Sequence, residues 1–156
     1  MRLWNRCKVL PGGRFVFSKV LGQLIPYSGS INALVTELDA GSAKIELMDR
    51  RRVRNHLDSI HAVALMNLCE LTSGLALHSV LPANRRAILT HFEIDYLKKA
   101  RGTLVGKAHY PWDDSKSADS FDDVIAVSIL NPAGELVCRA RATWRIGAQS
   151  TKQSKK

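Results

Sequence analysis

The chain has 156 residues and a formal net charge of +9, with 46% hydrophobic and 24% charged residues. A single domain of this size can bury roughly 68–70% of its unfolded surface, so it needs no disulfide or metal for stability. Cys7, Cys69 and Cys138 lie far apart without a Cys-x-x-Cys pair, which argues against a disulfide framework or a structural zinc site. We therefore expect a cytoplasmic, reducing environment.

No targeting segment or membrane span is predicted. The most apolar N-terminal stretch, residues 15–25, is interrupted by polar and charged residues, and no small-residue cleavage site follows it. Residues 148–156 carry Lys152, Lys155 and Lys156 but no acid, and we expect this tail to be disordered. The remaining residues, 1–147, are predicted to form one domain.

The N-terminal segment, residues 1–27, is predicted to add a short helix to that domain. After a partly apolar stretch, Pro11-Gly12-Gly13 breaks the chain, and apolar residues then recur at helical spacing up to Pro26. We expect this helix to pack on the domain as a lid or brace. A strand hairpin follows, with strands at residues 33–38 and 43–48 around a turn at residues 39–42.

The run from His61 to Leu81 is apolar on nearly every face of a helix and ends before Pro82, which predicts a helix enclosed by other structure. Four strands are then predicted, at residues 86–97, 102–110, 123–130 and 136–146, with a polar, mobile loop at residues 111–122. In the last strand apolar residues alternate with Arg139, Arg141, Thr143 and Arg145, so one face is buried and the other is cationic. The fold class is therefore α+β, an antiparallel sheet of about five to six strands wrapped around one long helix. Its open edges favour a dimer.

Two segments carry a resemblance to a known family. The stretch Asn55 to Ala64, followed by Glu70, resembles the N-x-x-G-x-x-H-G-G-A…D/E signature of the hotdog-fold thioesterases of the phenylacetate-pathway type, close to an uncharacterised subfamily. Residues 92–102 are similar to the strand and turn that follow the central helix there, so the resemblance covers residues 31–146. The chain departs from the signature at Asp58, which stands for Gly, at Ala62-Val63, which replaces Gly-Gly, and at Glu70, where many relatives carry Asp.

The resemblance implies hydrolysis of an acyl-CoA or acyl-carrier-protein thioester at a site between two subunits of a homodimer, which can pair further into a homotetramer. Glu70 would be the general base or the nucleophile, and the helix start of the other subunit would hold the thioester carbonyl. Coenzyme A would enter only as part of the substrate, with no metal or other cofactor. The basic excess suits its phosphates, and without a helix-turn-helix, zinc-finger or stacking motif no nucleic-acid partner is expected.

The residues themselves support such a site. Glu70 is the only acid between His61 and Leu81, and a carboxylate in an apolar helix costs free energy unless a polar cavity or a partner compensates. His61 lies roughly 180° away around the helix, so it is expected at the helix start, where free N–H groups of Ala62 and Val63 can stabilise an oxyanion. Asn55 would orient the carbonyl or the attacking water. The predicted substrate contacts are Asp58, Asn67, Ser73, Gly74 and Arg101.

Structural alternatives accompany each of these roles. Glu70 can instead be a structural acid, His61 a helix cap and Asn55 a turn residue. Arg50, Arg51, Arg52 and Arg54, like Lys98, Lys99 and Arg101, fit either a solvated surface or a phosphate clamp. For the whole protein the alternative is a non-catalytic module that binds or senses acyl ligands on the same scaffold.

Overall fold

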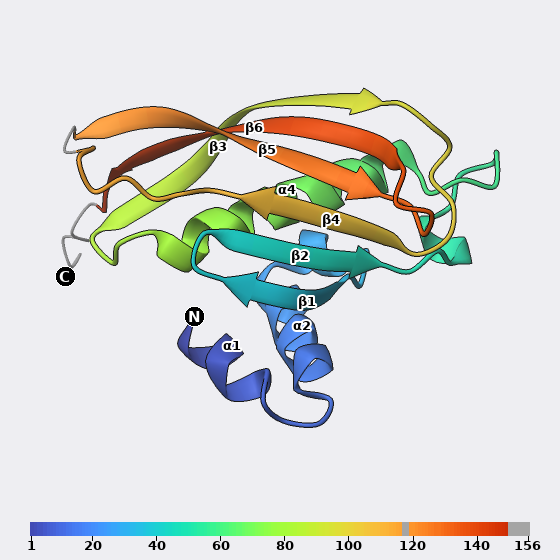
Figure 1. Cartoon of the computed structure of the whole chain (residues 1–156), viewed down its shortest axis with the longest axis horizontal. Helices are drawn as coiled ribbons and strands as arrows, with labels where there is room; N and C mark the ends of the chain where they lie inside the picture. The colour runs from blue at the N-terminus through green and yellow to red at the C-terminus, as the bar shows by residue number, and fades with distance from the viewer. Residues whose placement is uncertain (117–118, 150–156) are drawn as a thin grey trace, which may run out of the picture.

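The computed structural model describes residues 1–116 and 119–149, in which six strands form one antiparallel sheet around a central helix (Figure 1). The sheet order is β1-β2-β4-β5-β6-β3. The predicted α+β architecture is therefore confirmed. The strands are β1 (Leu34–Asp39), β2 (Ser42–Leu47), β3 (Arg85–Tyr96), β4 (Leu104–His109), β5 (Ser120–Leu130) and β6 (Leu136–Ala148).

Helix α4 (Ala62–Val80) lies along the inner face of this sheet, as its uniformly apolar sequence predicts. Its side chains at Leu68, Cys69, Ala76 and Leu77 are completely buried. By length and composition α4 could cross a membrane, but it is the core helix of this domain and more than half of it is buried. Pro82 follows its last turn and ends it, because proline cannot continue the hydrogen-bond ladder.

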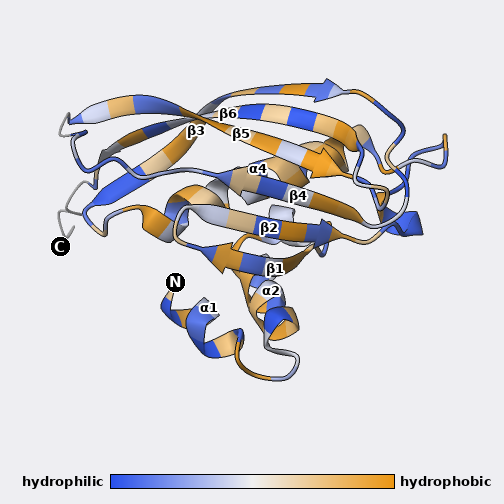
Figure 2. Cartoon of the chain, in the orientation of Figure 1, coloured by the Kyte–Doolittle hydropathy of each residue, from blue (hydrophilic) through white to orange (hydrophobic). Residues whose placement is uncertain are grey.

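The alternation predicted for the last strand is present in β6. Cys138, Ala140, Ala142 and Ile146 are buried against α4, while the arginines between them face solvent on the outer side of the sheet. Figure 2 shows the same alternation of apolar and polar residues along the neighbouring strands. Cys69 of α4 meets Cys138 of β6 with a sulfur–sulfur distance of 4.0 Å, so these thiols help to pack the helix on the sheet.

Three helices precede the sheet: α1 (Arg2–Cys7), α2 (Gly13–Leu24) and α3 (Pro26–Gly29). The expected helix that ends before Pro26 is α2, whereas α1 was not predicted. It forms through tertiary packing, because Trp4 meets Phe17 of α2 edge-to-face with 5.1 Å between ring centroids. Figure 1 shows α2 below β1, and the Ser18 hydroxyl accepts a hydrogen bond from the Val35 N–H at 2.9 Å.

Two boundaries differ from the prediction. Strand β5 begins at Ser120, so the end of the predicted mobile loop at residues 111–122 is a paired strand. Strand β6 reaches Ala148, the first residue of the predicted tail, because its last residues pair with the start of β3. The rest of that tail, residues 150–156, lies outside the described residues, as do residues 117–118 of the loop.

Candidate active site

The first turn of α4 presents a free backbone donor. His61 precedes the helix as its N-cap, and its Nδ1 accepts a hydrogen bond from the Val63 N–H at 3.1 Å. Within the described residues nothing accepts from the Ala62 N–H, so this donor is available to a ligand. Together with the positive end of the helix dipole it can stabilise an oxyanion. The cap that the sequence allowed for His61 is therefore present.

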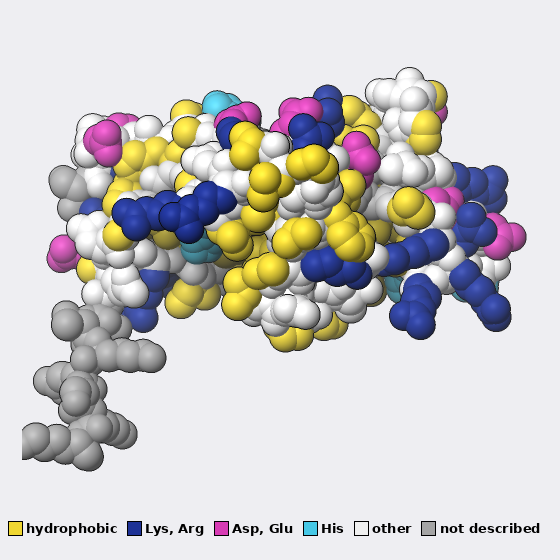
Figure 3. All heavy atoms as spheres, turned by 90° about the horizontal axis from the view of Figure 1, so that it is seen from below, with side chains coloured by type: hydrophobic (Ala, Val, Ile, Leu, Met, Phe, Trp, Pro, Cys, Tyr) yellow, Lys and Arg dark blue, Asp and Glu magenta, His cyan; other side chains and the backbone are white. Residues whose placement is uncertain are grey.

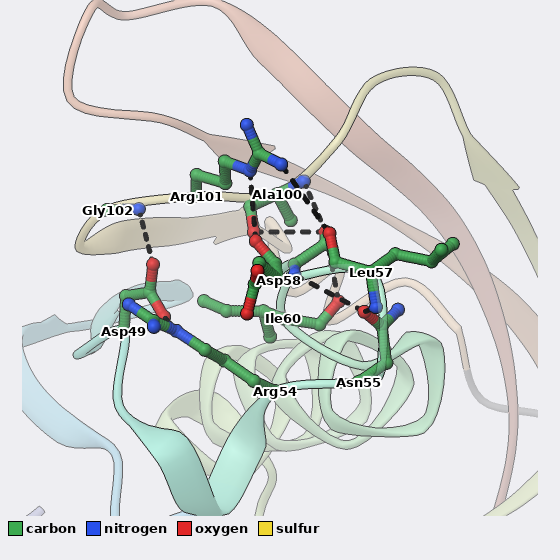
Figure 4. A network of polar contacts seen from close by, with 10 residues as sticks. Asp49, Arg54, Asn55, Leu57, Asp58, Ile60, Ala100, Arg101 and Gly102 are labelled. Carbon is green, nitrogen blue, oxygen red and sulfur yellow. Dashed lines mark hydrogen bonds and ion pairs between the residues drawn. The ribbon is translucent and has the colours of Figure 1, made fainter.

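The loop that leads into α4 is held rigidly by hydrogen bonds (Figure 4). The Asn55 Oδ1 accepts from the N–H groups of Leu57 at 2.9 Å and Ser59 at 3.3 Å. Arg101, on the connection between β3 and β4, donates from Nε to the Asp58 carbonyl at 2.9 Å. Both Asn55 and Arg101 thus shape the loop that sets the direction of the helix start.

A carboxylate supports the same loop from the other side. Asp49 accepts from the Gly102 N–H at 2.9 Å and forms an ion pair with Arg54 at 2.6 Å (Figure 4). These two hydrogen bonds and the charge of Arg54 hold the pKa of Asp49 below its ordinary value, despite the opposing effect of burial. The loop before α4 is therefore tied to the β3–β4 connection through charged and backbone groups.

Asp58 occupies a backbone conformation that glycine would adopt more easily. Its φ is +51°, in the left-handed region where an L side chain costs roughly 1–2 kcal/mol, less for Asp than for most residues. This is the position at which the family signature has Gly. The backbone here is therefore left-handed although the residue is Asp.

We expect Asp58→Gly to leave stability nearly unchanged, since relief of this strain offsets the greater freedom of glycine in the unfolded chain. Asp58→Val should lower the free energy of unfolding by about 1–2 kcal/mol, because a branched side chain does not tolerate positive φ. Urea denaturation of both variants measures the difference. Equal stability of the two variants would show that this backbone conformation is not maintained in solution.

Glu70 lies near the middle of α4, half-buried beneath the N-terminal helices. Its Oε2 accepts a long hydrogen bond of 3.5 Å from the Ser28 hydroxyl of α3. Burial raises the pKa of Glu70 above its ordinary value, and the hydrogen bond from Ser28 lowers it in part. No cation in the described part of the chain forms an ion pair with this carboxylate.

Asn67 precedes Glu70 by one turn of the same helix face. Its Nδ2 donates to the Tyr27 carbonyl at 3.1 Å, but its Oδ1 is buried and has no partner among the described groups. A buried amide oxygen without a donor costs free energy, and this oxygen is closed to solvent in the structure. Helix α3 thus contacts both polar residues of this helix face, Asn67 through Tyr27 and Glu70 through Ser28.

Ser73 and Gly74 face the sheet instead. The Ser73 hydroxyl accepts a hydrogen bond from the Trp144 indole N–H at 3.2 Å, and the same ring fills the space beside Gly74, 3.4 Å from where a Cβ would lie. The gap that Gly74 leaves is therefore occupied by Trp144 of β6. The Ser73 hydroxyl also donates to the Glu70 carbonyl at 2.9 Å, but this is a backbone contact within the helix and does not reach the Glu70 carboxylate.

The candidate residues thus form two groups within one chain. Asn55, Asp58, His61 and Arg101 surround the helix start, whereas Glu70 lies nine residues further on, about 13 Å along the helix axis. Sequence reasoning missed Ser28, whose partner is 42 residues away, and Tyr96, whose hydroxyl donates to the Ala62 carbonyl at 3.1 Å. Tyr96 also lines a groove of about 330 Å³ beside the helix start.

Basic side chains gather at this end of the molecule, where Figure 3 shows Lys and Arg concentrated. Arg51, Arg52 and Lys99 are exposed, and no ion pair neutralises them within the described residues. Lys98 pairs with Glu135 at 2.7 Å and so is partly neutralised. Residues 1–116 and 119–149 contain no group of three or more His, Cys, Asp or Glu arranged to hold a metal ion.

Comparison with known proteins places this chain in a family. The family model described as a domain of unknown function (DUF4442) matches residues 13–146. A search of curated proteins found no match. The crystal structure of the genomics protein APC5556 superposes with a TM-score of 0.81 at 28% identity, covering 95% of this chain and 97% of that one.

Two further solved structures are named as thioesterases. A protein from Pseudomonas aeruginosa, described as a probable thioesterase, has a TM-score of 0.77 at 17% identity and covers 90% of this chain and 97% of its own. A thioesterase from Haemophilus influenzae has a TM-score of 0.72 at 14% identity, with 85% and 92% covered. At these identities the likeness establishes the hotdog fold, as the sequence resemblance implied.

Proposed function

Since the chain belongs to the DUF4442 family and has the hotdog fold of the thioesterases it resembles, we propose that it hydrolyses acyl thioesters. The observation that carries this proposal is the half-buried Glu70 on the central helix, which has no cationic partner in the described chain. Burial raises the pKa of this carboxylate, which makes it a stronger base.

In the proposed reaction the thioester carbonyl accepts a hydrogen bond from the Ala62 N–H at the helix start. Glu70 takes a proton from a water, and the water oxygen bonds to the carbonyl carbon. Alternatively, Glu70 attacks the carbonyl itself and water hydrolyses the resulting anhydride. In both routes the carbon–sulfur bond breaks, one proton of the water passes to the leaving sulfur, and the free acid and the thiol leave.

The two groups must come from different subunits, because they are about 13 Å apart on one helix. Strand β3 supports such an assembly: it lies at an edge of the sheet, and its one partner in the described chain is β6. Exposed apolar side chains are present on this edge strand, at Ile88, and on the first turns of α4, at Val63 and Met66. We propose a homodimer joined along β3, which would cover these side chains and complete two sites.

The carrier of the acyl group is proposed to be coenzyme A or an acyl-carrier protein. Three exposed basic residues lie at the same end of the molecule as the helix start: Arg51, Arg52 and Lys99. Their charges suit the phosphates that both carriers contain. The second candidate function, a non-catalytic acyl-binding module, is favoured by one observation. The Val63 N–H already donates to His61, which leaves Ala62 as the free donor of that pair.

A thiol-release assay across acyl-CoA chain lengths tests the proposal. Hydrolysis should appear with at least one chain length at a kcat/KM of about 10⁴ M⁻¹s⁻¹ or more, the lower end of ordinary enzymes. Acyl-carrier-protein substrates are measured in parallel. Binding of acyl-CoA without thiol release for any substrate would favour the non-catalytic module.

The pH dependence of kcat/KM should report the raised pKa of Glu70. The base must be ionised, so activity is lost as the pH falls through its pKa, and burial moves that point above the ordinary value of 4.5. Removing the hydrogen bond with Ser28→Ala should move the acidic limb higher still, because this bond favours the ionised form. An acidic limb at or below pH 4.5 would contradict the role of Glu70.

A further inference from the structure

The N-terminal helices cover the polar part of α4. Ser28 and Tyr27 of α3 hold Glu70 and Asn67 through the hydrogen bonds described above. Helix α3 is fixed in turn against α2, because a Cβ on Gly29 would lie 2.2 Å from the Gly22 carbonyl oxygen. Only glycine permits this approach of the two backbones. The wall above the catalytic carboxylate is therefore built from residues outside the family signature.

A cavity with two lobes adjoins that wall. The inner lobe has a volume of about 250 Å³ and is bounded by α2, α3, β1 and α4, with Ser28 and Leu71 among its lining residues. The outer lobe has a volume of about 170 Å³ and lies between α2 and the first hairpin, with mostly apolar walls such as Phe15 and Met48. Both lobes are lined by Ser18, Lys19, Asn32 and Ala33, so the two are adjacent.

We infer that the inner lobe binds the acyl group of the substrate and limits it to short and medium chains. This inference rests on the proposed thioester hydrolysis. Ser28 both lines the lobe and contacts Glu70, so the lobe begins next to the residue that holds the carboxylate, and we infer that the acyl chain passes Ser28 to reach it. Leu21, Val35 and Leu71 supply apolar walls for its methylene groups.

The volume of the inner lobe and the residues at its far end set the length of the acyl chain that it can hold. At roughly 30 Å³ for each small group, the share of one water in the liquid, the inner lobe of about 250 Å³ holds roughly eight carbon atoms. Beyond them lies the hydrogen bond from the Lys19 ammonium to the Asn32 Oδ1, 2.8 Å long, between the two lobes. A longer chain would have to bury methylenes against the exposed Lys19 ammonium and remove water from it, which is unfavourable.

Binding of non-hydrolysable thioether analogues, butyl-, octyl- and dodecyl-CoA, tests the inference by calorimetry. The wild-type protein should bind octyl-CoA at least about tenfold more tightly than butyl-CoA, since each buried methylene favours binding, and dodecyl-CoA no more tightly than octyl-CoA. Ala33→Leu, which fills the cavity where the lobes meet, should remove the gain from butyl to octyl and change butyl-CoA affinity less than twofold. Leu21→Phe provides a second filling variant from α2 if Ala33→Leu does not fold.

Ala126→Leu is the matched control, because Ala126 is exposed on the outer face of β5 and away from the cavity. It should keep the wild-type chain-length profile. An unchanged profile in both filling variants, or the same loss in the control, would overturn the inference. Octyl-CoA binding that depends on Ala33, with no thiol release from any acyl-CoA thioester, would retain the pocket and reject hydrolysis. Hydrolysis with a chain-length profile that Ala33→Leu does not change would retain hydrolysis and reject the pocket.

Discussion

Glu70→Gln is expected to reduce kcat by about 10²–10⁴-fold if Glu70 is the general base, and by more if it is the nucleophile. The amide keeps the volume of the carboxylate and can still accept the hydrogen bond from Ser28, but it cannot take a proton or attack a carbonyl. Binding of a thioether analogue should therefore change little, so that the loss falls on the chemical step.

The stability of this variant gives a second, independent expectation. Burial raises the pKa of Glu70 in the folded protein, so its ionised form is disfavoured there relative to the unfolded chain. This penalty is present above the unfolded pKa and absent below it. Glu70→Gln should therefore melt at the same or a higher temperature than wild type at pH 7–8, and the difference should shrink near pH 4.

The control for Glu70→Gln is Glu37→Gln, an exposed acid of β1 that pairs with Lys44. It should change neither kcat nor the melting temperature appreciably, since exposed ion pairs contribute little. Measuring kcat and melting temperature on one preparation of each protein separates the two roles of Glu70. A lower melting temperature with an intact kcat would assign Glu70 a structural role.

The sequence predicted those parts of the fold whose signals are local and repeated. The apolar run of α4 and the alternation in β6 describe residues whose neighbours in sequence share one environment, so periodicity identified them. Helix α1 was missed because its side chains form no N-cap hydrogen bond and it depends on the contact of Trp4 with Phe17. Propensity alone cannot reveal a helix that forms only through tertiary packing.

The same difference between local signals and tertiary contacts decided which residues of the candidate site could be predicted. Glu70 and His61 stand out in the sequence because a polar group in or beside an apolar helix is conspicuous. Ser28 gives no such signal, since a serine in a short N-terminal segment becomes significant only when folding brings it to Glu70. The support that Arg101 gives to the loop at Asp58 also became visible only in the structure, and its predicted contact with substrate stays a prediction. Distances across the fold, and not residue types, decide these roles.

Ala62→Pro is expected to reduce kcat by about 10²–10³-fold, the usual effect of losing one oxyanion donor, without unfolding α4. Proline is tolerated at the first helical position, where no intrahelical acceptor exists for the N–H. The preceding His61 has φ −65° and ψ 141°, the extended conformation that a following proline requires. Ala62→Gly, which keeps the N–H, is the control and should retain most activity.

Mixing Ala62→Pro with Glu70→Gln then tests whether the site spans two subunits. If each site joins Glu70 of one subunit to the helix start of the other, a mixed dimer contains one intact site and one doubly altered site. Random reassociation of equal amounts should therefore restore about a quarter of wild-type activity, although each variant alone is nearly inactive. If both groups acted within one chain, no mixture could contain an intact site and activity would stay at the level of the separate variants. Sedimentation of the same samples must find dimers, because a monomer at micromolar concentration would be incompatible with a shared site.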